Sequence, residues 1–228
     1  MTRILLVACI VFGVLALAQG PVALVNGEPI TREELDMATG LSEVIFALYQ
    51  QFPAFAQSLL LTEEGKAFLA RYERDVLEKI ILRRIQIQEA QARGLTADEA
   101  EIAKRTQDTL DQIYAYYGLT EDELIAELLY QGYTLEQFME DIARQHRDEI
   151  LIETLKAAVI AEVTVTEDEI ESYYGTDPTR FVDEAGEMLP LEAVRDRIAT
   201  ILLGEKGEAY WQDWLTKARE GADVEINL

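Results

Sequence analysis

The chain has 228 residues, of which 49% are hydrophobic and 28% are charged, and its formal net charge is −23. This composition predicts a folded core rather than disorder. The excess of acid argues against binding to nucleic acid or to anionic lipid, because both need clustered Lys and Arg.

Residues 1–18 are typical of a secretory signal. Arg3 gives a positive start, residues 4–17 are apolar but too short for a comfortable membrane span, and Ala16-Leu17-Ala18 has the small-x-small pattern of a cleavage site. We expect cleavage after Ala18, which would remove Cys9, the only cysteine. The alternatives are an uncleaved anchor and lipid attachment at Cys9, and the position of Cys9 early in the apolar run disfavours the second.

The next residues predict a short strand at 22–25 and a turn at Asn26-Gly27. Helix starts are marked by a repeated capping box, Thr-x-x-Glu/Gln, in which the Thr hydroxyl and the later side chain bond each other's backbone amides. The boxes begin at Thr31, Thr96, Thr120, Thr134 and Thr166. Gly94, Gly118 and Gly132 each precede a capping Thr by two residues, where the preceding helix should end.

These signals, with the hydrophobic periodicity, divide the chain into helices. Helices are expected at 31–51 (ended by Pro53), 63–93, 97–117, 121–131, 135–161, 167–174 and 190–220, the last interrupted near Gly204 and Gly207. A further apolar stretch reaches Leu61, and 179–189 looks irregular.

The tail "ADVEINL" alternates as a strand does, with Val224, Ile226 and Leu228 on one face. A lone strand leaves its backbone groups unpaired, so we expect 224–228 to pair with 22–25. This pairing makes residues 19–228 one mainly α domain with a small terminal β pairing. Within it we distinguish an N-terminal module (19–175), a linker (176–189) and a closing helix and strand (190–228).

Signals of catalysis are few. His146, the one histidine, continues an apolar stripe with Phe138, Ile142 and Ile150, which favours packing at the core edge over a role as a base. No nucleophile motif, zinc spacing or phosphate loop occurs, so we expect no catalytic residue, no metal and no cofactor. A carboxylate pair in a cleft is the one enzymatic alternative left by the many acidic residues.

Apolar and aromatic residues are more informative. Residues 43–61, "EVIFALYQQFPAFAQSLLL", are apolar on more than one face and must bury two faces or leave one exposed. An exposed apolar patch usually marks a partner site, which here could hold unfolded polypeptide. The candidate peptide-binding residues are Phe46, Tyr49, Phe52, Phe55, Tyr114 and Tyr117.

Several stretches together resemble one family. "VALVNGEPITREELD", "LEKIILRRIQIQEAQARGLTADEAEI", "GLTEDELIAELLYQGYTLEQFMEDIARQHRDEILIETL", "VTVTEDEIESYYGTDPTRF" and the closing "LPLEAVRDRIATILLGEKGEAYWQDWLTKAREGADVEINL" are similar, in order and spacing, to SurA-type and PrsA-type extracytoplasmic folding factors. In that family a parvulin prolyl-isomerase domain usually precedes the closing helix. Here only residues 182–189 separate Phe181 from Pro190.

The resemblance therefore implies the chaperone module without prolyl-isomerase activity. It implies ATP-independent binding of unfolded exported or outer-membrane proteins, in the periplasm or another extracytoplasmic space. The alternative is a non-catalytic scaffold or dimerisation module that docks one specific envelope partner, with a homodimer as one form.

Overall fold

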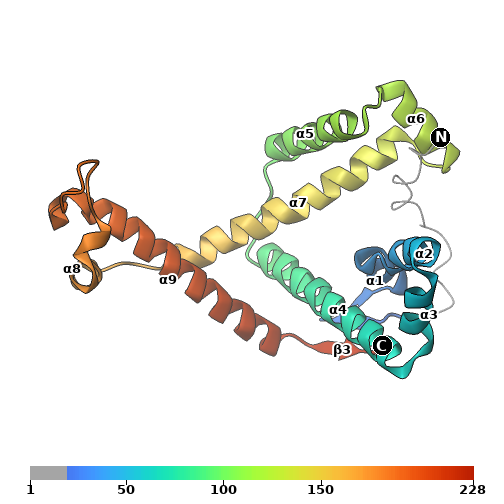
Figure 1. Cartoon of the computed structure of the whole chain (residues 1–228), viewed down its shortest axis with the longest axis horizontal. Coiled ribbons are helices and arrows are strands. Elements are labelled where there is room, and N and C mark those ends of the chain that lie inside the picture. Colours follow the sequence, from blue (N-terminus) through green and yellow to red (C-terminus); the bar gives the residue numbers. More distant parts are fainter. Residues whose placement is uncertain (1–19) are drawn as a thin grey trace. The chain divides into compact units, whose positions relative to one another are not determined.

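The computed structural model describes residues 20–228 (Figure 1), so the expected signal segment 1–18 lies outside the described residues. The described part is mainly helical, as expected, with short strands at its two ends. The helices are α1 (Arg32–Thr39), α2 (Leu41–Gln51), α3 (Pro53–Leu61), α4 (Glu63–Ala92), α5 (Glu99–Tyr117), α6 (Glu121–Tyr130), α7 (Leu135–Ile160), α8 (Glu167–Thr176) and α9 (Leu191–Gly221), with a 3-10 turn η1 (Pro178–Arg180). The strands are β1 (Ala23–Val25), β2 (Glu28–Ile30) and β3 (Val224–Ile226).

The chain folds as two compact units. The first contains the described residues up to Thr154 together with 221–228, and the second is Leu155–Glu220. The expectation that residues 19–228 form one domain, with a linker at 176–189, stays a prediction.

The pairing expected between the two ends of the described chain is confirmed. Strand β1 lies between β2 and β3 and pairs antiparallel with both. Opposite β3, Ala23 faces Ile226 and Val25 faces Val224. Ala23 and Val25 are fully buried, so the first strand anchors the sheet to the helices of the first unit.

The hairpin that brings β2 beside β1 was not expected from the sequence. Asn26 and Gly27 have φ of 50° and 82°, the positive values that a two-residue hairpin turn requires. Asn26 also joins the two ends of the described part: its amide donates to the Asp223 carbonyl (2.7 Å), and its side-chain oxygen accepts from the Asp223 amide (2.9 Å).

Most of the predicted helix starts are confirmed. Thr120, Thr134 and Thr166 form reciprocal capping boxes, and Thr31 accepts from the Glu34 amide at 3.0 Å. The start predicted at Thr96 is wrong, because the carboxylate of Asp98 caps α5 instead.

Two other helix predictions need correction. The helix expected at 31–51 is broken at Gly40, whose φ of 56° ends α1 and separates it from α2. The interruption expected near Gly204 and Gly207 is absent, since α9 runs unbroken from Leu191 to Gly221.

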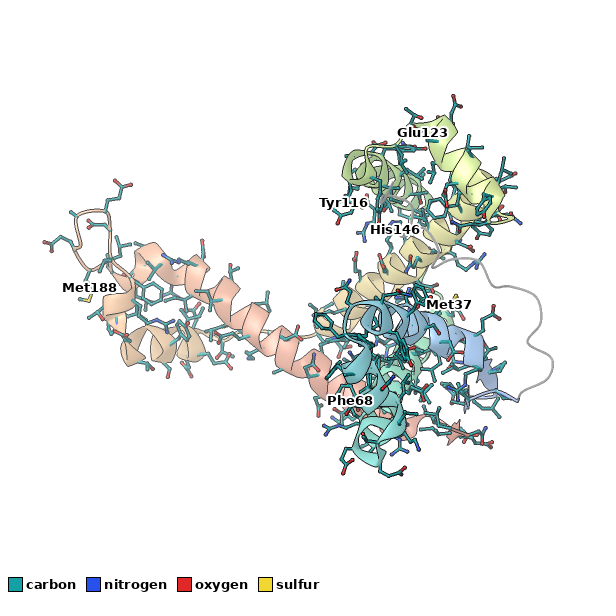
Figure 2. The ribbon with its side chains drawn as sticks, turned by 45° about the vertical axis from the view of Figure 1, so that its right-hand side comes forward. Met37, Phe68, Tyr116, Glu123, His146 and Met188 are labelled. Carbon is teal, nitrogen blue, oxygen red and sulfur yellow. The ribbon has the colours of Figure 1, made fainter. Side chains whose placement is uncertain are left out.

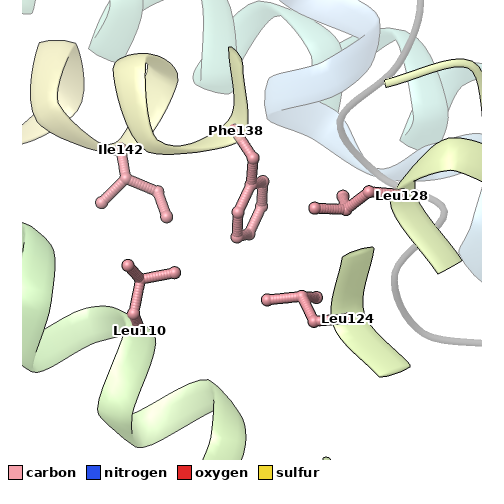
Figure 3. Close-up of a cluster of buried hydrophobic side chains, with 5 residues drawn as sticks. All are labelled: Leu110, Leu124, Leu128, Phe138 and Ile142. Atoms are coloured by element: carbon pink, nitrogen blue, oxygen red, sulfur yellow. The ribbon is translucent and has the colours of Figure 1, made fainter. Parts of the chain in front are cut away.

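Each unit has its own apolar cluster. Figure 3 shows the first, in which side chains from α5, α6 and α7 point toward one another. Its buried members are Leu110, Leu124, Leu128, Phe138 and Ile142. In the second unit, Ile170, Phe181, Val194 and Ile198 bring α8 and the turn after η1 onto α9.

Ion pairs should make the folding stability of both units depend on pH. In the second unit, Lys206 donates to both carboxylate oxygens of Glu169 (2.7 and 2.9 Å) and, with the Thr166 amide, lowers the pKa of Glu169 below its ordinary value of 4.5. In the first unit, Arg105 lowers the pKa of Glu153 in the same way. A carboxylate with a lowered folded pKa stabilises the fold above its unfolded pKa, and that stabilisation is lost as the pH falls through the folded pKa.

We therefore expect Glu169→Gln to melt at a lower temperature than the wild type above pH 5, and the difference to shrink toward zero as the pH falls below 4. Thermal melts followed by circular dichroism between pH 3 and 7 measure it. Glu205→Gln, at an exposed position with no ion pair among the described residues, is the control and should show no such trend. A difference for Glu169→Gln that does not change with pH would contradict this account.

Candidate functional site

An uncharged segment covers two helices of the first unit. Residues 44–62 contain no Asp, Glu, Lys or Arg, although 28% of the chain is charged. The segment folds as α2 and α3, which are separated at Phe52 because Pro53 lacks the amide that would continue the first helix. Within 20–228, no helix is both long and apolar enough to cross a membrane.

These helices leave much of their apolar surface in solvent. No residue of α2 is buried, and the side chains of Phe46, Phe52 and Phe55 are 58 to 60% exposed. The neighbouring helices α1 and α4 pack against this pair and add further exposed side chains. We call the set the α1–α4 apolar surface; it consists of Met37, Val44, Phe46, Tyr49, Phe52, Phe55, Leu61, Phe68 and Tyr72.

Two contacts fix the helices that carry this surface. At the α3–α4 junction, the Thr62 hydroxyl accepts from the Gly65 amide (3.1 Å) and donates to the Ser58 carbonyl (2.6 Å). Gly65 is buried so closely against α3 that a Cβ there would lie 2.2 Å from the Leu59 carbonyl oxygen.

The second contact joins α4 to α1. The Tyr72 hydroxyl donates to the Thr39 carbonyl at 3.0 Å, at the residue where α1 ends. Figure 2 marks Met37 on α1 and Phe68 on α4. The apolar side chains are therefore held on hydrogen-bonded helices, not on a loose loop.

The six residues selected from the sequence fall into two groups. Phe46 and Tyr49 on α2, Phe52 between the helices and Phe55 on α3 all belong to the α1–α4 apolar surface. Tyr114 and Tyr117 lie on α5, which packs with α6 and α7. A single groove lined by all six stays a prediction.

The two tyrosines are only partly accessible. Tyr114 packs against the cluster of Figure 3, and burial, followed by the charges of Glu121 and Asp111, raises the pKa of its hydroxyl. Tyr117 is half-buried and packs edge-to-face with the exposed ring of Tyr116.

Five residues of this surface were not among the candidates selected from the sequence: Met37, Val44, Leu61, Phe68 and Tyr72. The i, i+4 spacing of Phe68 and Tyr72 was the signal available, because it places both rings on one face of α4. The helix at 63–93 was predicted from a different apolar stripe, which includes the buried residues Leu77, Ile81 and Ile85.

His146, the one histidine of the chain, lies outside this surface. His146 lies at the core edge, as expected, with one ring nitrogen 2.9 Å from the Thr109 hydroxyl and the other 3.1 Å from the Glu149 carboxylate. Among residues 20–228, no three His, Cys, Asp or Glu side chains are grouped closely enough to hold a metal ion.

A shallow hollow of about 460 Å³ lies in the second unit, lined by Glu162, Val163, Thr164, Lys206, Ala209 and Tyr210. Its lysine already binds the Glu169 carboxylate and the Thr164 carbonyl, so it offers no uncommitted cation to a ligand.

The chain matches the profile of one protein family and is similar to several proteins of known name. The profile of the SurA N-terminal domain matches residues 21–156. The foldase protein PrsA of Clostridium botulinum (strain Langeland) is 25% identical over 173 residues, which cover 76% of this chain and 49% of that protein. The foldase protein PrsA of Clostridium kluyveri (strain ATCC 8527) is 24% identical over 174 residues, 76% of this chain and 50% of that protein. The chain thus spans about half the length of the curated relatives it matches.

Among solved structures, a similar chain comes from work on PEB4 and the periplasmic protein Cj1289, described as two structurally related SurA-like chaperones of Campylobacter jejuni. It aligns with a TM-score of 0.49 and 12% identity, covering 91% of this chain and 99% of the other.

Proposed function

Because the chain belongs to the SurA N-terminal domain family, we propose that it is a chaperone that binds unfolded or partly folded exported proteins through the α1–α4 apolar surface, without ATP. The observation that carries this proposal is the exposure of that surface, which includes three phenylalanines more than half open to solvent on the uncharged segment. Exposed apolar area of this kind is characteristic of a partner site.

Binding would work by shielding. An apolar client segment that covers Phe46, Phe52 and Phe55 removes apolar area from water on both partners, which contributes roughly 25 cal/mol per Å². The flexible client loses conformational freedom on binding, so affinity should be modest and weakly selective for sequence. The acidic remainder of the protein, with net charge −23 for the whole chain, keeps the complex soluble.

Phe46, Tyr49, Phe52 and Phe55 are the proposed centre of the binding surface. Tyr114 and Tyr117, on α5, remain a second group of candidates; both are half-buried, so a client could reach only their exposed edges.

We place the protein outside the cytoplasm, on the strength of the signal segment expected at 1–18. Its clients would be unfolded exported or outer-membrane proteins. We also propose that it acts without prolyl-isomerase chemistry. The short segment between Phe181 and Pro190 supports this, since it folds back on itself with a bridge between Val182 and Met188.

The test is suppression of aggregation. The protein at a one-to-one ratio should slow the light scattering of a chemically denatured outer-membrane or secreted client on dilution, with no ATP present. Failure to slow it would contradict the proposal. Static light scattering of the protein alone examines the scaffold alternative: a stable dimer that buries residues 43–61 and leaves aggregation unchanged would favour a dimerisation module.

A further inference from the structure

The charges that border the α1–α4 apolar surface are mostly acidic. Residues 31–75 hold eight Asp and Glu against four Lys and Arg, a net charge of −4, and the uncharged segment lies between Glu43 at one end and Glu63 and Glu64 at the other. Three of the four cations are already in ion pairs: Arg32 with Asp36 and Glu73, Lys66 with Glu63, and Arg71 with Asp75.

Three of these eight carboxylates have no such partner, and two of the three, Glu43 and Glu64, lie at the ends of the uncharged segment. Glu43 and Glu64 are both exposed, and neither forms an ion pair with any residue in the described part of the chain. Glu64 differs in this respect from its neighbour Glu63, whose carboxylate lies 3.1 Å from the Lys66 ammonium. Each is therefore open to a cation supplied from outside.

Each of these carboxylates precedes an exposed phenylalanine by about one helical turn. Phe46 follows Glu43 by three residues on α2, and Phe68 follows Glu64 by four on α4. Residues at these spacings share a helix face. Long side chains on a helix lean toward its N-terminus, so we expect each ring to lean toward the turn that carries the carboxylate.

A carboxylate beside an open aromatic ring is a favourable place for a cation. The ring face attracts an ammonium or guanidinium group, and the carboxylate pairs with it. The client's own apolar residues would occupy the rest of the surface. The same two positions repel an acidic client segment, and the net charge of the whole protein adds to that repulsion.

On the basis of the proposed function, we infer that the α1–α4 apolar surface selects client segments in which an apolar or aromatic run is flanked by Lys or Arg, with the flanking cations held at Glu43–Phe46 and Glu64–Phe68.

The test uses three fluorescent peptides that share one apolar and aromatic run and differ only in their flanks, which are Lys, Ser or Glu. Fluorescence anisotropy measures their affinity for the protein at about 20 mM and 300 mM salt. Exposed pairs of this kind contribute a factor of about three each, so the Lys-flanked peptide should bind about tenfold more tightly than the Glu-flanked one at low salt. The ratio should fall at high salt, because exposed charges are screened.

The double variant Glu43→Gln/Glu64→Gln removes both carboxylates, so it should bring this ratio close to one while the Ser-flanked peptide binds as before. The matched control, Glu140→Gln/Glu205→Gln, removes the same charge at exposed positions on α7 and α9 and should leave the ratio unchanged. Circular dichroism verifies that both variants are folded. The salt series on the wild-type protein tests the inference independently of the variants.

Equal binding of the three peptides would overturn the inference and leave the proposed function standing. An equal loss in the control variant would also overturn it, because the preference would then come from overall charge. If no peptide binds, both the inference and the proposed function are contradicted.

Discussion

Replacing Phe46, Phe55 and Phe68 together by Ser should remove most of the suppression of client aggregation and leave the protein folded. The three side chains are 58 to 60% exposed in the free protein, so their loss should change stability no more than ordinary surface substitutions do. In a complex they would be covered, and exposed aromatic side chains of this kind supply a large share of binding energy. We expect client affinity to fall at least about tenfold, with the melting temperature within a few degrees of the wild type.

The matched control replaces three exposed apolar residues of α5 and α6, namely Tyr116, Leu129 and Tyr130, by Ser. These side chains are as exposed as the phenylalanines or more so, but they lie outside the α1–α4 apolar surface. Loss of suppression in the control, with retention in the phenylalanine variant, would move the binding surface to α5 and α6.

Gly65→Ala should destabilise the first unit and weaken client binding at the same time. The new Cβ would lie 2.2 Å from the Leu59 carbonyl oxygen, which is backbone and cannot rotate away. The α3–α4 junction must then open, at a cost of roughly 1–3 kcal/mol as for other overpacked sites. For a chain of this size we expect a fall in melting temperature of about 2–10 °C.

Because α3 carries Phe55, its displacement from α4 should also reduce the suppression of aggregation. Gly204→Ala is the control: this glycine lies within α9 and a Cβ there meets open space, so the change should be neutral or slightly stabilising. A Gly65→Ala protein as stable as the wild type would show that the junction is not tightly packed.

Helix starts could be predicted from the sequence because their signals are local. At Thr120, Thr134 and Thr166 the hydroxyl accepts from the backbone amide three residues later, and the side chain of that later residue accepts from the Thr amide. These hydrogen bonds need no tertiary contact. The prediction failed at Thr96, where Asp98 supplies a competing acceptor that bonds the amides of Ala100 and Glu101.

The glycines are weaker signals, because a glycine can either end a helix or lie within one. Gly40 ends a helix in the left-handed region, whereas Gly204 and Gly207 remain helical. At Gly207 the small residue packs against Ile160, 3.8 Å away, a contact between residues far apart in sequence that local patterns do not reveal. Strand β2 was missed because Pro29 is unusual in strands, yet it is tolerated here on the edge of the sheet.

The candidate site was predictable only in part. The absence of charge in residues 44–62 indicated that apolar side chains would be either doubly buried or exposed, and the sequence could not decide between these outcomes. In the structure Phe46 and Phe55 are exposed, because few helices pack around α2 and α3. Tyr114 is partly buried, because it lies one turn after the core residue Leu110 on the same face of α5.

The central claim is that clients contact the α1–α4 apolar surface, and site-specific photo-crosslinking measures this most directly. A photoreactive phenylalanine analogue is placed at position 46, 55 or 68, or at the comparison positions 116 and 130, and the protein is irradiated with an unfolded client. The account predicts strong client adducts from 46, 55 and 68 and weak ones from 116 and 130. Adducts of equal strength at all five positions, or confined to 116 and 130, would contradict it.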